Sequence, residues 1–335
     1  MSGVEITRTD PLDHAADIKH LFLTHERPEF PDFFDRAYPS AVRSGARSWI
    51  GVDTDQRLVL HIGQFPRRFT FREQTVVAGL LVNLMAAKSH RTFLPAVRLL
   101  RRMTEESRAA AELDFLYGDP SAAAQAVFKA AGYSTLGMLD RFVLPLGGDR
   151  WYSDTAVRLY RMVVRLVAWT GRLGAVRHEA SGFDADAFEH PEGNAPCLRP
   201  FRPHALYHQR LAGYPSRTDY WFTFRADARS DHAIAAAFVR GSPDRTAKLL
   251  TIARPPDLSL TALVPALATA LRRLGYSRLW ILTLTGTHLA HELSCAGFVP
   301  RHENTPLIAF GLTELGDRVM RSSSTWEITE LDCDR

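Results

Sequence analysis

The feature that most constrains this chain is a short helix-and-strand ending that occurs twice. The first copy is an alanine-rich segment, residues 121–131, followed by Gly132-Tyr133 and an apolar strand. The second, weaker copy is residues 286–298, which again ends in a glycine and an aromatic residue before a strand. Alanine favours helices and glycine is common just after a helix end, so each copy predicts a helix that stops before a strand. This repetition predicts two similar modules.

Length and composition set broad limits on the chain. It has 335 residues, of which 46% are hydrophobic, and this is enough to bury a core in each of two ordinary domains. The formal net charge of +4 is small for a nucleic-acid-binding protein. Cys197, Cys295 and Cys333 lack the spacing of a zinc site, and their odd number does not indicate a disulfide framework. We expect a soluble, cytoplasmic protein without a transmembrane segment or a bound metal.

Hydrophobic periodicity predicts the elements of a first module, residues 1–149. Alternating or continuous apolar runs predict strands, and apolar residues spaced three and four apart predict helices. The predicted strands are residues 4–7, 49–52, 57–62, 75–86, 112–117 and 141–144. The predicted helices are residues 14–24, 32–41, 95–107 and 121–131. The nearly continuous apolar run at 75–86 is typical of a central strand that is buried on both faces.

A connecting segment, residues 150–200, leads to a second module, residues 201–335. Residues 151–175 predict a helix with an arginine-rich side. This side is either a solvated face or a contact surface for an acidic carrier, a phosphate-bearing partner or a membrane surface. Residues 182–208 predict an irregular linker. The elements expected after this linker are strands 220–225, 233–240, 247–252, 277–284 and 306–310, and helices 260–274 and 288–296. Their order matches the first module from its second strand onward.

Three short motifs occur in a fixed order along the chain. They are Tyr-Gly-Asp-Pro-Ser at 117–121, Tyr-His-Gln-Arg-Leu-Ala-Gly-Tyr-Pro at 207–215, and Trp-Glu-Ile-Thr-Glu-Leu-Asp-Cys-Asp at 326–334. Together with the helix that ends at Gly132-Tyr133, they resemble a group of bacterial tandem proteins of the GNAT superfamily of acyl-CoA N-acyltransferases. Members of this group are often associated with polysaccharide or cell-envelope loci. The resemblance implies an α/β (α+β) fold of two GNAT-like modules, each with a mixed, mostly antiparallel central sheet flanked by helices.

The resemblance also implies an acyl-CoA or acetyl-CoA donor, bound where the central strand of the first module runs into a helix. Free amides at such a helix start bind an anionic pyrophosphate. The superfamily loop reads Arg/Gln-x-x-Gly-x-Gly/Ala, whereas residues 90–95 read His-Arg-Thr-Phe-Leu-Pro. Phe93 thus replaces a glycine that allows close approach to phosphate, and it either narrows the site or indicates another donor. The implied donor-binding residues are Met85, Ala87, His90, Arg91, Thr92 and Phe93.

The proton-transfer groups depart from the superfamily pattern. The tyrosine that often protonates the departing thiolate is Phe128 in the first module and Leu293 in the second. Tyr117 and Asp119, at the end of the fifth predicted strand, are the candidates for the acid and for the base or amine anchor. The Asp-Pro-Ser sequence at 119–121 is equally an ordinary helix N-terminus, and that simpler interpretation stays open.

Two further positions are candidates for contact with the substrate. Asp114 lies three residues before Tyr117 on the same predicted strand. Asn83 interrupts the apolar central strand, where it either orients the substrate or occupies a β-bulge. In the second module Pro255 and Pro256 remove two amide donors from the equivalent loop, so we expect that module to be structural or substrate-binding.

The resemblance therefore implies an N-acyltransferase that acts on the amine of a small molecule, such as an amino sugar or an amino acid. Two alternatives stay open. One is an aminoacyl-tRNA-dependent transferase similar to the Fem-type tandem enzymes, with tRNA as partner, which the arginine-rich side of residues 151–175 favours. The other is a noncatalytic GNAT-like binding protein, which the loss of the glycine loop and of the tyrosine acid favours.

Overall fold

The computed structural model describes residues 3–25, 27–147, 174–179, 198–201, 218–225, 233–255, 258–329 and 332–333. In the first half of the chain the strands are β1 (Glu5–Thr9), β2 (Arg47–Val52), β3 (Leu58–Phe71), β4 (Gln74–Ala86), β5 (Phe115–Gly118) and β6 (Ser134–Pro145). The helices there are α1 (Ala15–Leu23), α2 (Phe30–Arg43), α3 (Phe93–Ala110) and α4 (Ala122–Ala130). A 3₁₀ turn, Lys88–His90, joins β4 to α3.

The second half repeats this pattern. Its strands are β7 (Gly174–Glu179), β8 (Arg199–Phe201), β9 (Thr218–Arg225), β10 (Ala233–Gly241), β11 (Thr246–Ala253), β12 (Arg278–Leu284) and β13 (Val299–Gly311). Its helices are α7 (Leu260–Arg273), α8 (His288–Cys295) and α9 (Glu314–Arg321). In both halves a strand, a helix, a parallel strand, a second helix and an antiparallel strand follow one another.

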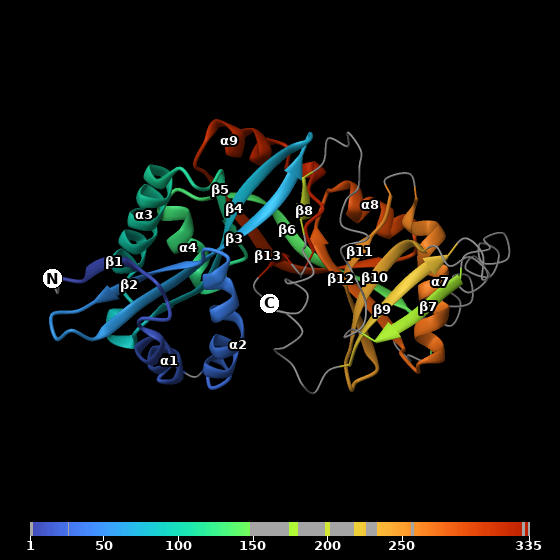
Figure 1. Ribbon diagram of the computed structural model, residues 1–335, viewed down its shortest axis with the longest axis horizontal. Coiled ribbons are helices and arrows are strands. Elements are labelled where there is room, and N and C mark those ends of the chain that lie inside the picture. Colours follow the sequence, from blue (N-terminus) through green and yellow to red (C-terminus); the bar gives the residue numbers. More distant parts are fainter. Residues whose placement is uncertain are drawn as a thin grey trace.

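Within the described residues, 13 strands form one sheet that runs along the molecule (Figure 1). The order is β1-β2-β3-β4-β5-β13-β6-β12-β11-β10-β9-β7, and β8 pairs with β3. The β4–β5 and β11–β12 pairs are parallel, and the other pairs are antiparallel.

The two halves exchange a strand at the centre of this sheet. β13, from the end of the chain, lies between β5 and β6, both of which belong to the first half. β6 in turn pairs with β12 of the second half over seven residue pairs, from Arg278–Pro145 to Leu284–Leu139. Each half therefore completes the sheet of the other.

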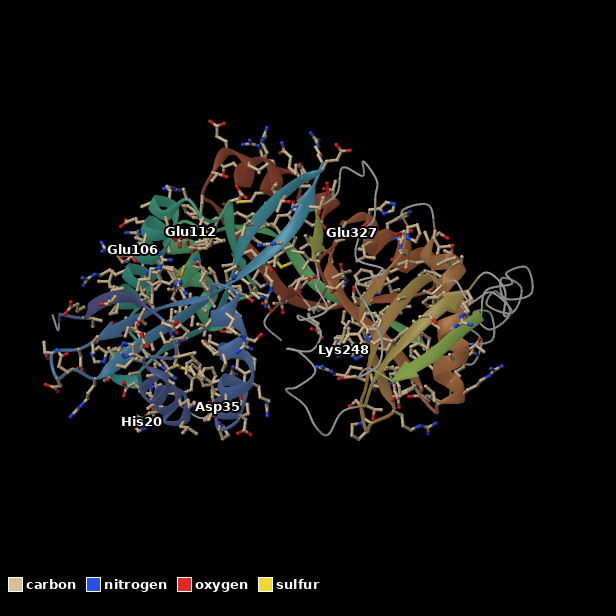
Figure 2. All side chains as sticks on the ribbon, in the orientation of Figure 1. His20, Asp35, Glu106, Glu112, Lys248 and Glu327 are labelled. Carbon is tan, nitrogen blue, oxygen red and sulfur yellow. The ribbon has the colours of Figure 1, made fainter. Side chains whose placement is uncertain are left out.

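Helices cover both faces of the first-half sheet, and β4 supplies both cores. Val76, Ala78, Leu80 and Val82 face the core beneath α1 and α2, where Phe34 and Tyr38 are fully buried. The alternate residue Leu81 packs in the core beneath α3 and α4. The Trp49 indole of β2 donates to the carboxylate of Glu106 at 2.7 Å. Glu106 lies on α3 (Figure 2), so this bond ties β2 to α3. The prediction that 75–86 is buried on both faces is thus confirmed for its middle residues.

Six elements differ clearly from the sequence predictions. β6 begins at Ser134, seven residues before the predicted strand 141–144, and β7 was not predicted. β3 continues to Phe71 and β13 begins at Val299, because both strands extend along neighbours that are distant in the sequence. β8 lies within the predicted irregular linker and pairs with Arg68–Thr70 of β3. α9 was not predicted, although Thr313 caps it by accepting from the Gly316 amide. Of the predicted arginine-rich helix 151–175, residues 151–173 lie outside the described residues, whereas residues 174 and 175 belong to β7, so that end of the prediction is wrong. The module boundaries stay predictions.

Candidate functional site

The candidate site lies where β4 and β5 separate. The two strands pair only over Ala78–Leu80 and Phe115–Tyr117, and then β4 continues to Ala86 while β5 ends at Gly118. A Cβ atom at Gly118 would lie 3.2 Å from the Leu81 carbonyl oxygen, which accounts for a glycine at the point of divergence. A cavity of about 900 Å³ fills the space that opens beyond it.

The cavity is lined by the ends of several elements. They are the last residues of β4, the starts of α3 and α4, residues 25 and 27 after α1, and residues 303–305 of β13. Its apolar wall includes Phe22 from the core beneath α1 and α2, and Ile62 and Phe128 from the core beneath α3 and α4. The cavity thus contacts residues from the cores on both faces of the sheet.

A β-bulge shapes the cavity wall at Asn83. The β3–β4 register shifts between His61–Met85 and Gly63–Val82, and Asn83 adopts a φ of 57°. The Asn83 carbonyl accepts from Nδ1 of His61 at 3.0 Å, and its side-chain amide donates to the Tyr38 hydroxyl at 3.1 Å. The sequence left two interpretations of Asn83, a β-bulge and a substrate contact. The bulge is present, and Asn83 also lines the cavity.

His61 holds this bulge as a neutral imidazole. It is fully buried, and burial lowers its pKa to about 4, against the opposing effect of the hydrogen bond to Asn83. Because a carbonyl only accepts, Nδ1 carries the proton, and Nε2 accepts from the Ser48 hydroxyl at 3.1 Å. Both ring nitrogens are therefore used in fixing the bulge.

Four of the six predicted donor-binding residues line the cavity: Met85, Arg91, Thr92 and Phe93. Phe93 has an exposed fraction of 48% and lies at the cavity wall. Nε of Arg91 donates to the Ala86 carbonyl at 3.1 Å, which holds the guanidinium at this wall.

Ala87 and His90 are not among the residues that line the cavity. The Ala87 amide donates to the Val59 carbonyl at 2.8 Å and continues the strand pairing. Nδ1 of His90 bonds to the Ser89 hydroxyl at 2.9 Å in the 3₁₀ turn. The geometry does not support donor contacts from these two side chains.

The starts of α3 and α4 meet at the cavity. At the start of α3 the N-cap residue Thr92 and the first two helical residues, Phe93 and Leu94, each carry an amide N–H, whereas the third, Pro95, does not. α4 begins after Ser121, whose side chain makes no capping hydrogen bond, and Asp119 lines the cavity just before it. Two helix N-termini thus give this end of the cavity a positive potential that favours anions.

The structure places Tyr117 and Asp114 away from the cavity. Tyr117 is fully buried, and its hydroxyl donates to the Asp332 carbonyl at 2.8 Å, which anchors the end of the chain. The Asp114 carboxylate accepts from the Val77 amide at 2.9 Å and from the Thr313 hydroxyl at 3.0 Å, and so joins β4 to the start of α9. Neither side chain lines the cavity, so the acid role expected of Tyr117 and the substrate contact expected of Asp114 lack support here.

The equivalent opening in the second half is bridged by an ion pair. Arg254, which follows β11, donates to the Glu292 carboxylate of α8 and to the Leu258 carbonyl. The Arg254 and Glu292 side chains are only 10% and 15% exposed. In the first half the residue that directly follows β4 is Ala87, which corresponds to Arg254 after β11. When Gly132-Tyr133 is aligned with Gly297-Phe298, Val127 corresponds to Glu292. The first half thus has small or apolar side chains where the second half has a bridge.

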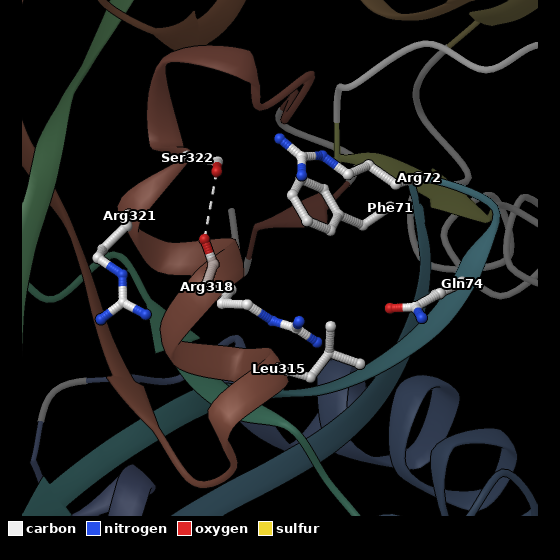
Figure 3. Close-up of a pocket in the computed structure, with 7 residues that line it drawn as sticks. All are labelled: Phe71, Arg72, Gln74, Leu315, Arg318, Arg321 and Ser322. Carbon is white, nitrogen blue, oxygen red and sulfur yellow. Dashed lines mark hydrogen bonds between the residues drawn. The ribbon is translucent and has the colours of Figure 1, made fainter.

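A second hollow of about 380 Å³ lies between the tip of the β3–β4 hairpin and α9 (Figure 3). Leu315 and Arg318 point from α9 toward the hairpin, whereas Arg321 points away from it (Figure 3). Arg72 and Glu73 form the turn with φ angles of 47° and 66°. The residues that line this hollow include no carboxylate or histidine, so they offer no acid or base for catalysis.

Comparisons with known proteins support the fold. No protein-family model and no curated protein sequence matches the chain. Among solved structures, it is similar to a conserved protein of unknown function from Enterococcus faecalis described as a probable N-acyltransferase. The TM-score is 0.65, with 11% identity over 93% of this chain and 73% of that chain. It is also similar to a GCN5-related N-acetyltransferase from Kribbella flavida, with a TM-score of 0.61 and 14% identity over 91% of this chain and 71% of that chain.

A tandem GNAT protein from the clavulanic acid biosynthesis pathway matches over almost its whole length. Its TM-score is 0.52, with 12% identity over 93% of this chain and 99% of that chain. The chain therefore has the tandem GNAT fold that the sequence motifs indicate. Among the described residues, no three His, Cys, Asp or Glu side chains come together as a metal site requires. None of the described helices is long and apolar enough to span a bilayer.

Proposed function

We propose that the chain is an N-acyltransferase that moves an acyl group from an acyl-CoA to the amine of a small molecule. The observation that carries the proposal is the cavity at the divergence of β4 and β5, with a bulged strand and two helix N-termini at its wall. In a GNAT fold this arrangement offers one compartment to an anionic donor and to a second substrate.

The donor side of the proposal rests on the start of α3. The amides of Thr92, Phe93 and Leu94 and the guanidinium of Arg91 present positive charge to a phosphate group. Because Pro95 has no amide N–H, the start of α3 offers a phosphate one amide donor fewer than a helix start without proline. It therefore offers fewer donors than a glycine-rich loop. Because acyl-CoA is an intracellular metabolite, the proposal implies a cytoplasmic protein.

The acceptor side rests on two carboxylates at the cavity wall. Asp119 precedes α4, and Glu303 belongs to β13 of the other half of the chain. A carboxylate attracts a protonated amine and can orient it before reaction. Asp119 therefore keeps its proposed role as amine anchor, and Asn83 at the bulge keeps its proposed contact with the substrate.

Only the first half is proposed to bind the donor. In the second half the Arg254–Glu292 ion pair occupies the corresponding opening, and Pro255 follows directly. The proposal therefore predicts one donor site per chain.

A thermal-shift panel of CoA, acetyl-CoA and longer acyl-CoA thioesters tests the donor site. A ligand that binds only the folded state raises the melting temperature. The proposal expects a shift that Arg91→Ala abolishes and that Arg98→Ala, an exposed arginine on α3 that does not line the cavity, leaves unchanged.

Three outcomes would contradict the proposal in different ways. A shift that survives Arg91→Ala and vanishes with Arg254→Ala would move the donor to the second half. Binding of aminoacyl-tRNA without any response to thioesters would favour the tRNA-dependent alternative, and its affinity would fall steeply with salt. No response to any donor would favour a noncatalytic binding protein.

A further inference from the structure

Two side chains from the segment that follows α1 line the cavity, and the proposed donor site uses neither of them. They are His25 and Arg27. The Lys88 amide donates to Nε2 of His25 at 2.8 Å, so this nitrogen carries the lone pair and the proton lies on Nδ1. Nδ1 is buried, and no described residue accepts a hydrogen bond from it. A buried N–H group without an acceptor costs free energy, so a ligand that places an oxygen at Nδ1 gains a hydrogen bond.

Arg27 offers a cation to the same cavity. Its Nε pairs with the Glu29 carboxylate at 3.3 Å, and the two side chains are 56% and 66% exposed. An ion pair this exposed to water contributes little free energy, so it does not keep the guanidinium from a ligand. Within the described part of the chain, no residue bonds the two terminal nitrogens of Arg27. Together these nitrogens can bind both oxygens of a carboxylate.

The helix that leads to Arg27 packs on the face of the sheet opposite to the proposed donor cradle. α1 contributes Ile18 and Phe22 to the core on one face, and α3 contributes Val97 to the core on the other (Figure 1). The donor phosphates are assigned to the start of α3 and to Arg91. The cation that follows α1 is therefore left for the second substrate.

The cavity wall also carries two carboxylates. Glu303 pairs with Arg141 at 2.6 Å, so its charge is balanced within the protein. Asp119 is the proposed amine anchor, and it leads into α4, whose Phe128 packs on the same face as α3. The cavity therefore offers a carboxylate from the side of α4, and a guanidinium and an N–H donor from the side of α1. These groups complement a small molecule that carries both an amine and an anionic group.

We propose that the acceptor is an amino acid, with its amine at Asp119 and its carboxylate bound by Arg27 and by Nδ1–H of His25. This inference rests on the proposed N-acyltransferase function and narrows its acceptors to amines that also carry a carboxylate. A carboxylate only accepts hydrogen bonds, which matches the two donors. An amino sugar without an acid group leaves both donors without a partner. The loss of a hydrogen bond between charged groups lowers affinity about 10- to 100-fold.

The test compares matched acceptors with the full chain. Each amino acid is paired with its amide, in which a neutral group replaces the carboxylate, and with the amine that lacks this group, and glucosamine represents the amino sugars. Thiol release from acetyl-CoA gives kcat/KM for each acceptor. Isothermal titration gives the affinity for acetyl-CoA, and melting temperatures confirm that the variants fold.

Two variants and one control are measured in this way. Arg27→Ala removes the guanidinium. His25→Gln removes the Nδ1 donor, and its side-chain oxygen can still accept from the Lys88 amide. Arg43→Ala is the matched control, because Arg43 is an exposed arginine at the end of α2 that does not line the cavity.

We expect the unmodified chain and the control to prefer the amino acid over its amide by about tenfold or more in kcat/KM. In Arg27→Ala, kcat/KM for the amino acid falls to the value for its amide, and in His25→Gln it falls part of the way, while the affinity for acetyl-CoA is retained.

Three results overturn the inference and leave the proposed function intact. They are equal use of amino acids and their amides, a preference that survives Arg27→Ala, and a loss of acetyl-CoA affinity in Arg27→Ala, which would assign this cation to the donor. If the unmodified chain cleaves no thioester with any acceptor, the proposed function itself fails, and the inference fails with it.

Discussion

At the scale of single residues, the network around the β4 bulge is sensitive to pH. The pKa of His61 is lowered from 6.5 to about 4 in the folded chain, so the unfolded chain binds a proton more readily. This contribution to stability is complete above about pH 6.5 and is lost as the pH falls toward 4. Its full size is about 3 kcal/mol.

Urea unfolding at pH 7 and pH 4.5 tests this linkage. We expect the free energy of unfolding to fall more steeply with acidification in the unmodified chain than in His61→Gln, which cannot titrate. Equal pH dependence in the two proteins would show that His61 is protonated in the folded state or is not buried as described.

Tyr117 gives a second prediction for a single residue. Because its hydroxyl bonds to the Asp332 carbonyl in the core, Tyr117→Phe leaves a buried acceptor without its donor. The expected cost is about 1 to 2 kcal/mol of unfolding free energy, with acyl transfer unchanged once the protein is folded. A large fall in the rate at unchanged stability would restore Tyr117 as the candidate acid that its place at the end of the fifth predicted strand suggested.

Single residues also show where sequence reasoning stops. Asn83 stands out in an apolar strand, and this local signal gave the bulge as one of two interpretations. Nδ1 of His302 donates to the Asp140 carboxylate at 2.6 Å, although the two residues are far apart in the sequence and no local pattern connects them. Their contact arises only from the pairing of β6 with β13.

At the scale of elements, the exchange of β6 and β13 couples the two halves in folding. Without β13, β5 and β6 of the first half have no strand between them. We expect a fragment of residues 1–149 to show no cooperative unfolding transition, since its central strands lose their backbone partners. Calorimetry of this fragment alone, and after mixing with residues 150–335, measures the effect. A cooperative transition of the isolated fragment at the melting temperature of the whole chain would contradict it.

Most helices and strands were predictable because their apolar spacing is local. α3 and α7 show helical periodicity, and β4 shows a continuous apolar run, so each was found within a few residues of its ends. The outer part of β3 was not predicted, because the sequence Pro66-Arg67-Arg68 is typical of a loop. These residues form a strand because they pair with β4. Exchange between halves is a long-range property that periodicity does not encode.

At the scale of the whole molecule, one sheet carries two similar openings, and they differ in a few side chains. The opening in the first half is a cavity, and that in the second half is crossed by Arg254 and Glu292. The sequence resemblance indicated this asymmetry through the proline-containing loop. It did not predict that β13 of the second half would supply part of the cavity wall in the first.

The central claim is that one chain binds one acyl-CoA, in the first-half cavity. Isothermal titration of acetyl-CoA into the full chain tests it most directly, with Ala124→Trp as a substitution that fills the cavity and Ala109→Trp, on the exposed end of α3, as control. We predict one site per chain, lost in Ala124→Trp and retained in Ala109→Trp. Two sites per chain, or binding that survives Ala124→Trp, would contradict the account.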